Sequence, residues 1–129
     1  MKIKRVEHIA IAVHKMAESM AMLKNTLGPE LGYKETINST KLAMFPVGET
    51  SLELLEAQSP NSPVADWIEE RGRSLFRLCF DVENIDAALD ELRAKGVKLL
   101  DETPKAGHGS RRIAFLDPAS TGDILIELA

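Results

Sequence analysis

One short pattern occurs twice in this chain of 129 residues and constrains its fold more than any other feature. Residues 6–13 read V-E-H-I-A-I-A-V, and residues 76–82 read F-R-L-C-F-D-V. His8 and the apolar run after it align with Arg77 and the run after that, at an offset of 77 − 8 = 69 residues. Both stretches have the length and apolar content of strands. The shared offset indicates a chain built from two copies of one module.

The first predicted strand places a histidine among small residues. Successive side chains of a strand point to opposite faces, so His8 shares one face with Ala10 and Ala12, and the bulky aliphatic residues between them take the other. The small neighbours leave room beside the imidazole. In isolation, a histidine in an apolar strand is more often a satisfied core residue than a ligand, and this stretch alone favours the core residue.

Length and charge narrow the class of protein. A chain of 129 residues is the usual size of one domain. We expect a single domain with one module at about residues 1–57, a bridging helix at about 62–72 and a second module at about 74–129. The formal net charge of -4 lacks the electrostatic footprint of a nucleic-acid binder. A local cluster of Lys105, Arg111 and Arg112 could still attract a small anionic molecule.

Cysteine content and hydropathy indicate the cellular compartment in which the protein is expected. The single cysteine, Cys79, lies in an apolar strand and cannot form an internal disulfide, so we expect a buried, unreactive thiol. The N-terminus lacks the apolar run of a signal peptide, and no stretch approaches the roughly 20 apolar residues of a membrane span. We therefore expect a soluble cytoplasmic protein with no membrane partner.

Turn formers and hydrophobic periodicity divide the first half into elements. The predicted elements are a helix over residues 14–27, strands over residues 33–36, 41–47 and 50–56, and a short bridging helix over residues 64–71. Ser62 followed by Pro63 is typical of a helix start, because the hydroxyl caps backbone N–H groups and proline fits the first turn. Gly72 is expected to end this helix.

The second half repeats this order. The predicted elements are a strand over residues 76–82, a helix between Asn84 and Gly96, strands over residues 97–100, 113–116 and 123–128, and a loop over residues 103–112. Each half then reads βαβββ, which predicts an α+β fold with a curled sheet around one cleft. The closing I-L-I-E-L echoes S-L-E-L of the first half, so Glu127 occupies the position of Glu53. We expect His8, Glu53, Arg77 and Glu127 to point into that cleft.

Several longer motifs carry a family resemblance. V-E-H-I-A-I-A-V, P-V-G-E-T-S-L-E-L-L-E, S-P-N-S-P-V-A-D-W-I-E-E-R-G, K-A-G-H-G-S-R-R-I-A-F-L-D-P and I-L-I-E-L occur in this order over nearly the whole chain. In these motifs the chain resembles the vicinal oxygen chelate superfamily, which includes glyoxalases and bleomycin-resistance proteins. Within it, the sequence is most similar to the methylmalonyl-CoA epimerase family. The resemblance implies a glyoxalase-like fold, and a homodimer is expected from it as well.

The resemblance also implies a divalent metal ion (Co, Mn, Ni or Zn) held by one residue from each of four strands. His8, Glu53 and Glu127 match three of those positions and ligand types. Arg77 takes the fourth position, where the family has a histidine, and a guanidinium has no lone pair to donate. Its positive charge would repel the ion and pair with a carboxylate, so Arg77 argues against a bound metal.

The implied reaction is proton transfer next to the thioester carbonyl of a small acidic substrate, such as an acyl-CoA. The resemblance makes Glu127 the candidate base, and Arg77 could replace the metal as stabiliser of the enolate charge. Lys105 and His108, in the glycine-containing loop, are candidate substrate-binding residues. Two alternatives remain open: a metal-free binding protein of the same superfamily, and a glyoxalase-type lyase acting on another small substrate.

Overall fold

The computed structural model describes residues 1–129, which form two compact units. One unit is Ile9–Phe76, and the other combines Met1–His8 with Arg77–Ala129. Two strands, β1 (Ile3–Ala12) and β5 (Ser74–Val82), each contribute residues to both units. Because the division cuts β1 after His8, that histidine belongs to the same unit as Arg77 and the C-terminal strands.

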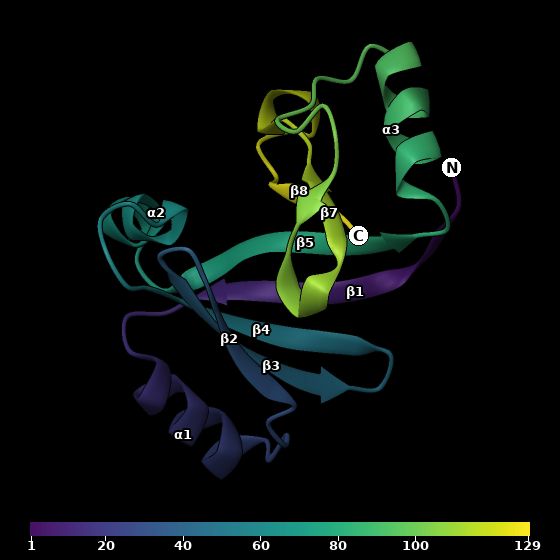
Figure 1. The fold of residues 1–129 in the computed structure, drawn as a ribbon. Helices are drawn as coiled ribbons and strands as arrows, with labels where there is room; N and C mark the ends of the chain where they lie inside the picture. The colour runs from purple at the N-terminus through teal and green to yellow at the C-terminus, as the bar shows by residue number, and fades with distance from the viewer. The chain divides into compact units, whose positions relative to one another are not determined.

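The unit Ile9–Phe76 contains strands in the order β2-β3-β4-β1, in which β3 is antiparallel to both β2 and β4. Its elements are α1 (Met16–Thr26), β2 (Tyr33–Ile37), β3 (Thr40–Val47), β4 (Thr50–Ala57) and α2 (Pro63–Arg71), all visible in Figure 1. Leu23 of α1 packs with Phe45 of β3 and Leu54 of β4 in a buried cluster. The helix predicted over residues 14–27 therefore packs on this sheet through its apolar side chains.

The predicted ends of the bridging helix α2 are confirmed. Ser62 accepts a hydrogen bond from the Val64 N–H at 3.2 Å, and Pro63 is the first helical residue. Gly72 ends the helix with φ 67°, in the left-handed region that glycine adopts most easily.

The unit Met1–His8 with Arg77–Ala129 has the strand order β1-β5-β8-β7-β6. Its further elements are α3 (Ile85–Ala94), β6 (Lys105–Ala106), β7 (Arg112–Phe115) and β8 (Ile126–Leu128). Strands β5 and β8 are parallel and pair Cys79 with Glu127, while β7 is antiparallel to β8. Leu89 of α3 packs against Leu128 of β8 in the apolar cluster of this unit. The element order confirms βαβββ for both halves and the α+β fold class.

Two strand predictions for the second half differ from the structure. Residues 97–100 form only one bridge, between Leu99 and Leu116, because the Lys98 N–H donates to the Ser120 hydroxyl at 3.0 Å instead of to a strand. The second strand of this half is instead β6, inside the predicted loop. The last strand begins at Ile126, not at residue 123, since Asp123 has φ 65°, which is incompatible with an extended strand.

The helices of the structure are short. None of them is both long enough and apolar enough to cross a lipid bilayer.

Candidate active site

A cluster of four buried ionisable side chains lies in the unit formed by Met1–His8 and Arg77–Ala129. They are Glu7 and His8 of β1, His108 in the turn before β7, and Glu127 of β8, with exposed fractions of 8%, 0%, 3% and 0%. Removing an ionised group from water costs several kcal/mol unless it is paired and hydrogen-bonded. Such a cluster therefore has to be held together by specific contacts.

A tight turn carries His108 into the interior. The Gly107 N–H donates to the Arg111 carbonyl at 2.8 Å, and the Arg111 N–H donates to the His108 carbonyl at 3.0 Å. Gly109 within the turn has φ 57°. A Cβ atom at residue 107 would lie 2.6–2.7 Å from side-chain atoms of Ile113, so glycine lets the turn lie directly against β7.

Glu7 joins the two histidines. Its Oε2 atom is hydrogen-bonded to Nδ1 of His8 and lies 3.1 Å from Nε2 of His108. The two imidazole rings meet edge to face, with centroids 4.7 Å apart and planes at 87°. One carboxylate thus fixes the orientation of both rings.

Glu127 faces the other side of the same two rings. Its Oε2 atom lies 3.6 Å from Nε2 of His8, and its Oε1 atom lies 3.7 Å from Nδ1 of His108. The Nε atom of Arg77 is 2.8 Å from Glu127 Oε2, which is a close ion pair. The predicted pairing of Arg77 with a carboxylate of the site therefore involves Glu127.

Both carboxylates of the cluster stay ionised at neutral pH. Burial alone would raise the pKa of Glu7, but hydrogen bonds with His108 and His8 outweigh it and lower the pKa well below its usual value. Burial opposes ionisation of Glu127 too, and the contact with His8 and the charge of Arg77 reverse that effect and lower its pKa. Burial instead raises the pKa of the Cys79 thiol to about 12, so this thiol stays protonated and unreactive, as its sequence context predicted.

The donor set of the cluster suits a divalent metal ion. His8, His108 and Glu127 offer two imidazole nitrogens and a carboxylate oxygen, all within 4.8 Å of one another. Two histidines and one carboxylate are a common ligand set of catalytic metal ions. A second group, Glu7 with His8 and Cys79, is also compact, but a buried protonated thiol is a poor ligand.

Comparisons with known proteins identify the family of the chain. The family model described as Glyoxalase/Bleomycin resistance protein/Dioxygenase superfamily matches residues 7–115, which is most of the chain. The chain belongs to this superfamily. An ethylmalonyl-CoA/methylmalonyl-CoA epimerase of Cereibacter sphaeroides is 32% identical over 128 residues, covering 96% of both chains. The uncharacterised protein YqjC of Bacillus subtilis is 32% identical over 126 residues, covering 96% of this chain and 90% of that protein.

Solved structures extend the similarity to three dimensions. A variant of Streptomyces coelicolor methylmalonyl-CoA epimerase in complex with 2-nitronate-propionyl-CoA matches with a TM-score of 0.94 and 29% identity. The match covers 98% of this chain and 94% of that one. The predicted glyoxalase-like fold is therefore confirmed.

The structure brings some of the predicted site residues of this glyoxalase-superfamily chain together. His8, Arg77 and Glu127 meet in the buried cluster, and His108, predicted for substrate binding, lies between them. Glu53 is fully buried in β4 and belongs to the other unit, Ile9–Phe76. Lys105 is half exposed and forms an ion pair with Asp101 at 3.0 Å, outside the cluster.

Glu7 is a residue of the cluster that was not predicted from the sequence. Alternation along β1 assigns this residue to the face opposite His8, yet its carboxylate bends back to the ring of its own neighbour. No sequence pattern signals that contact, because it depends on side-chain torsions. The one feature of the sequence that could have pointed to Glu7 is its position directly before His8.

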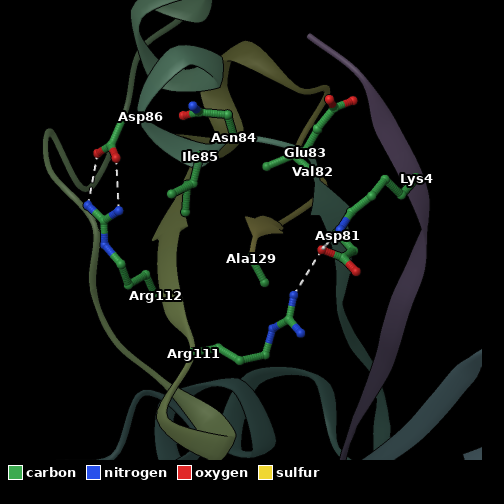
Figure 2. A pocket seen from close by; sticks show the side chains of 10 residues that line it. All are labelled: Lys4, Asp81, Val82, Glu83, Asn84, Ile85, Asp86, Arg111, Arg112 and Ala129. Carbon is green, nitrogen blue, oxygen red and sulfur yellow. Dashed lines mark hydrogen bonds and ion pairs between the residues drawn. The ribbon is translucent and has the colours of Figure 1, made fainter.

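A pocket of about 410 Å³ lies beside the turn that carries His108 (Figure 2). Asp81 on its wall is 95% buried and accepts contacts from Arg111 Nη2 at 2.9 Å, Arg5 Nε at 3.1 Å and Lys4 Nζ at 3.5 Å. Arg112 points away from Asp81 and forms a bidentate pair with Asp86 (Figure 2). The contact between Arg111 and Asp81 ties the turn to β5.

Replacing Asp81 with asparagine is expected to lower the free energy of unfolding by about 2 kcal/mol, since a buried acceptor of charged hydrogen bonds is lost while its cations remain. Urea denaturation followed by circular dichroism measures the change. Asp86→Asn is the matched control, because Asp86 is an exposed carboxylate that also pairs with an arginine. Equal, small effects of both substitutions would contradict the anchoring role of Asp81.

Proposed function

We propose that the protein is an isomerase of the epimerase type, which removes and returns the proton next to the thioester carbonyl of an acyl-CoA. Methylmalonyl-CoA is the first substrate to test. This choice is supported by the relatives named as epimerases of methylmalonyl-CoA and ethylmalonyl-CoA and by a solved epimerase bound to methylmalonyl-CoA. A homodimer stays a prediction.

The observation that carries the proposal is the buried cluster around Glu127 and Arg77, whose charged atoms are 2.8 Å apart. Removing a proton next to a carbonyl creates an enolate, and fixed cations in a buried site stabilise such a charge strongly. Arg77 is always protonated, so it supplies a permanent positive charge at this place.

The net charge of the cluster determines whether an enolate needs a further positive charge to be stabilised there. With neutral imidazoles, the carboxylates of Glu7 and Glu127 and the guanidinium of Arg77 leave one net negative charge, which opposes an enolate. A bound divalent ion would reverse this sign and polarise the thioester oxygen as a Lewis acid. In its absence, the guanidinium of Arg77 is the permanent positive charge of the cluster.

Glu127 is suited to holding charge more than to accepting a proton. A general base works best with a pKa near the working pH, whereas the contacts of Glu127 with His8 and Arg77 lower its pKa. We therefore assign Glu127 to anchoring the positive charge of the site, and its predicted role as base is the alternative that experiment must decide.

Proton exchange tests the proposal directly. The protein is incubated with methylmalonyl-CoA in D₂O, once after chelator treatment and once with added Co²⁺, and deuterium at the α-carbon is followed by NMR. Enzyme-dependent incorporation is expected. A rate no faster than that of substrate alone under both conditions would contradict the epimerase assignment and favour a binding protein.

A further inference from the structure

We propose that His108 completes a divalent-metal site with His8 and Glu127, and that Glu7 orients both histidines for the ion. The site is assembled from β1, β8 and a turn, so a turn residue supplies the nitrogen that Arg77 cannot give. The inference rests on the proposed function only for the use of the ion, and metal binding tests it independently.

The distances between the donor atoms are those of ligands that share an ion. The pairs His8 Nε2 with Glu127 Oε2 and His108 Nδ1 with Glu127 Oε1 are 3.6 and 3.7 Å apart. These separations are long for hydrogen bonds, which favour about 2.7–3.2 Å. Ligand atoms about 2.1 Å from one ion in tetrahedral arrangement lie roughly 3.4 Å from each other. With one ligand atom of each residue within 4.8 Å of the others, the three side chains are close enough to share one ion.

Glu7 selects which ring nitrogens face the ion. Nδ1 of His8 is hydrogen-bonded to Glu7 Oε2, and Nε2 of His108 lies 3.1 Å from the same oxygen, so in the neutral rings these two nitrogens carry the hydrogen. The lone pairs then reside on His8 Nε2 and His108 Nδ1, the two atoms that face Glu127. A carboxylate behind a ligating histidine is the usual device that fixes its tautomer and raises its basicity. Here one carboxylate serves two ligands.

The turn that presents His108 is built to hold it. Gly109 and Ser110 have φ of 57° and 60°, and a left-handed conformation at a serine persists only where the surroundings enforce it. Arg111, next in the chain, is bound to the buried Asp81 at 2.9 Å (Figure 2). Gly107 on the other side lies against Ile113 with no room for a Cβ atom. His108 is therefore fixed from both sides.

Arg77 is compatible with this arrangement. Its Nε atom lies 2.8 Å from Glu127 Oε2, so the second carboxylate oxygen, Oε1, faces His108 and can ligate. The guanidinium lowers metal affinity through repulsion but also keeps Glu127 ionised. We expect this site to bind the ion more weakly than a site with a histidine at position 77 would, but still specifically.

Metal titration of chelator-treated protein tests the site. Zn²⁺, Co²⁺, Mn²⁺ and Ni²⁺ are added separately, bound metal is measured by equilibrium dialysis with elemental analysis, and Co²⁺ binding is followed by its visible absorption. About one ion per chain is expected for at least one metal. His108→Gln should weaken binding at least about 100-fold, and Glu7→Gln about 10- to 100-fold. His14→Gln is the matched control, because His14 is exposed, and should bind like the unmodified protein.

A measurement on the unmodified protein guards against variants that fail to fold. The chain has 3 histidines, so their ring nitrogens can be assigned by ¹⁵N NMR. On addition of Zn²⁺ the coordinated-nitrogen shift is expected at Nε2 of His8 and at Nδ1 of His108, with His14 unchanged. No bound ion with any of the four metals, or ion binding that leaves the His108 ring unchanged, would overturn the inference. Metal binding through His108 without proton exchange would instead contradict only the proposed function.

Discussion

Glu127→Gln is expected to slow deuterium incorporation into methylmalonyl-CoA by at least about 100-fold, the usual effect of losing one electrostatic or acid–base group in an active site. The amide has nearly the same shape as the carboxylate but carries no charge. Both Arg77, at 2.8 Å, and the two histidines then lose the anion that they share. The rate is measured by NMR in D₂O at saturating substrate.

Metal content of the same variant separates the two roles of Glu127. Lost exchange together with lost Co²⁺ binding would assign Glu127 to the ligand set, whereas lost exchange with retained Co²⁺ would make it the base. Glu102→Gln is the control, since Glu102 lies in the same unit and is an exposed carboxylate that forms an ion pair with the Nε atom of Arg93. Unchanged exchange in Glu127→Gln would remove Glu127 from the reaction.

Most of the fold could be predicted because its signals are local. The offset between His8 and Arg77 revealed the doubled module, and Ser62 with Gly72 marked both ends of α2. The errors arose where hydrogen bonds outside the local sequence decide the structure. Lys98 donates to a serine 22 residues away, so an extended apolar stretch does not become a strand. Such a competing partner leaves no periodic signal.

The candidate site was predictable only in its strand residues. Strand alternation and the resemblance placed His8, Arg77 and Glu127 at related positions, and these three side chains do meet. His108 was assigned to substrate binding because the glycines around it would let the backbone approach a ligand and because the family resemblance favours that role. Its burial depends on the left-handed turn and on the absence of a side chain at Gly107, which alternation cannot encode. The place of His108 in the site could therefore be established only from the structure.

Arg77→Met is expected to lower the free energy of unfolding by about 3 kcal/mol in the presence of a chelator, the lower end of the cost of breaking a buried ion pair. The reason is that Glu127, which is fully buried, keeps its charge but loses its closest cation. Urea denaturation followed by circular dichroism measures the difference.

The double variant Arg77→Met with Glu127→Met should recover most of that loss, because replacing both partners leaves no unpaired charge. Arg112→Met, which breaks an exposed arginine–carboxylate pair, should change stability little.

A divalent ion gives the decisive comparison, because it can occupy the place of the lost cation. A ligand that binds only the folded state increases the free energy of unfolding by RT ln(1 + [L]/Kd). Zn²⁺ should therefore stabilise Arg77→Met more than the unmodified protein, in which Arg77 repels the ion. Equal stabilisation of both proteins would mean that Arg77 and the metal ion do not compete for the charge of Glu127.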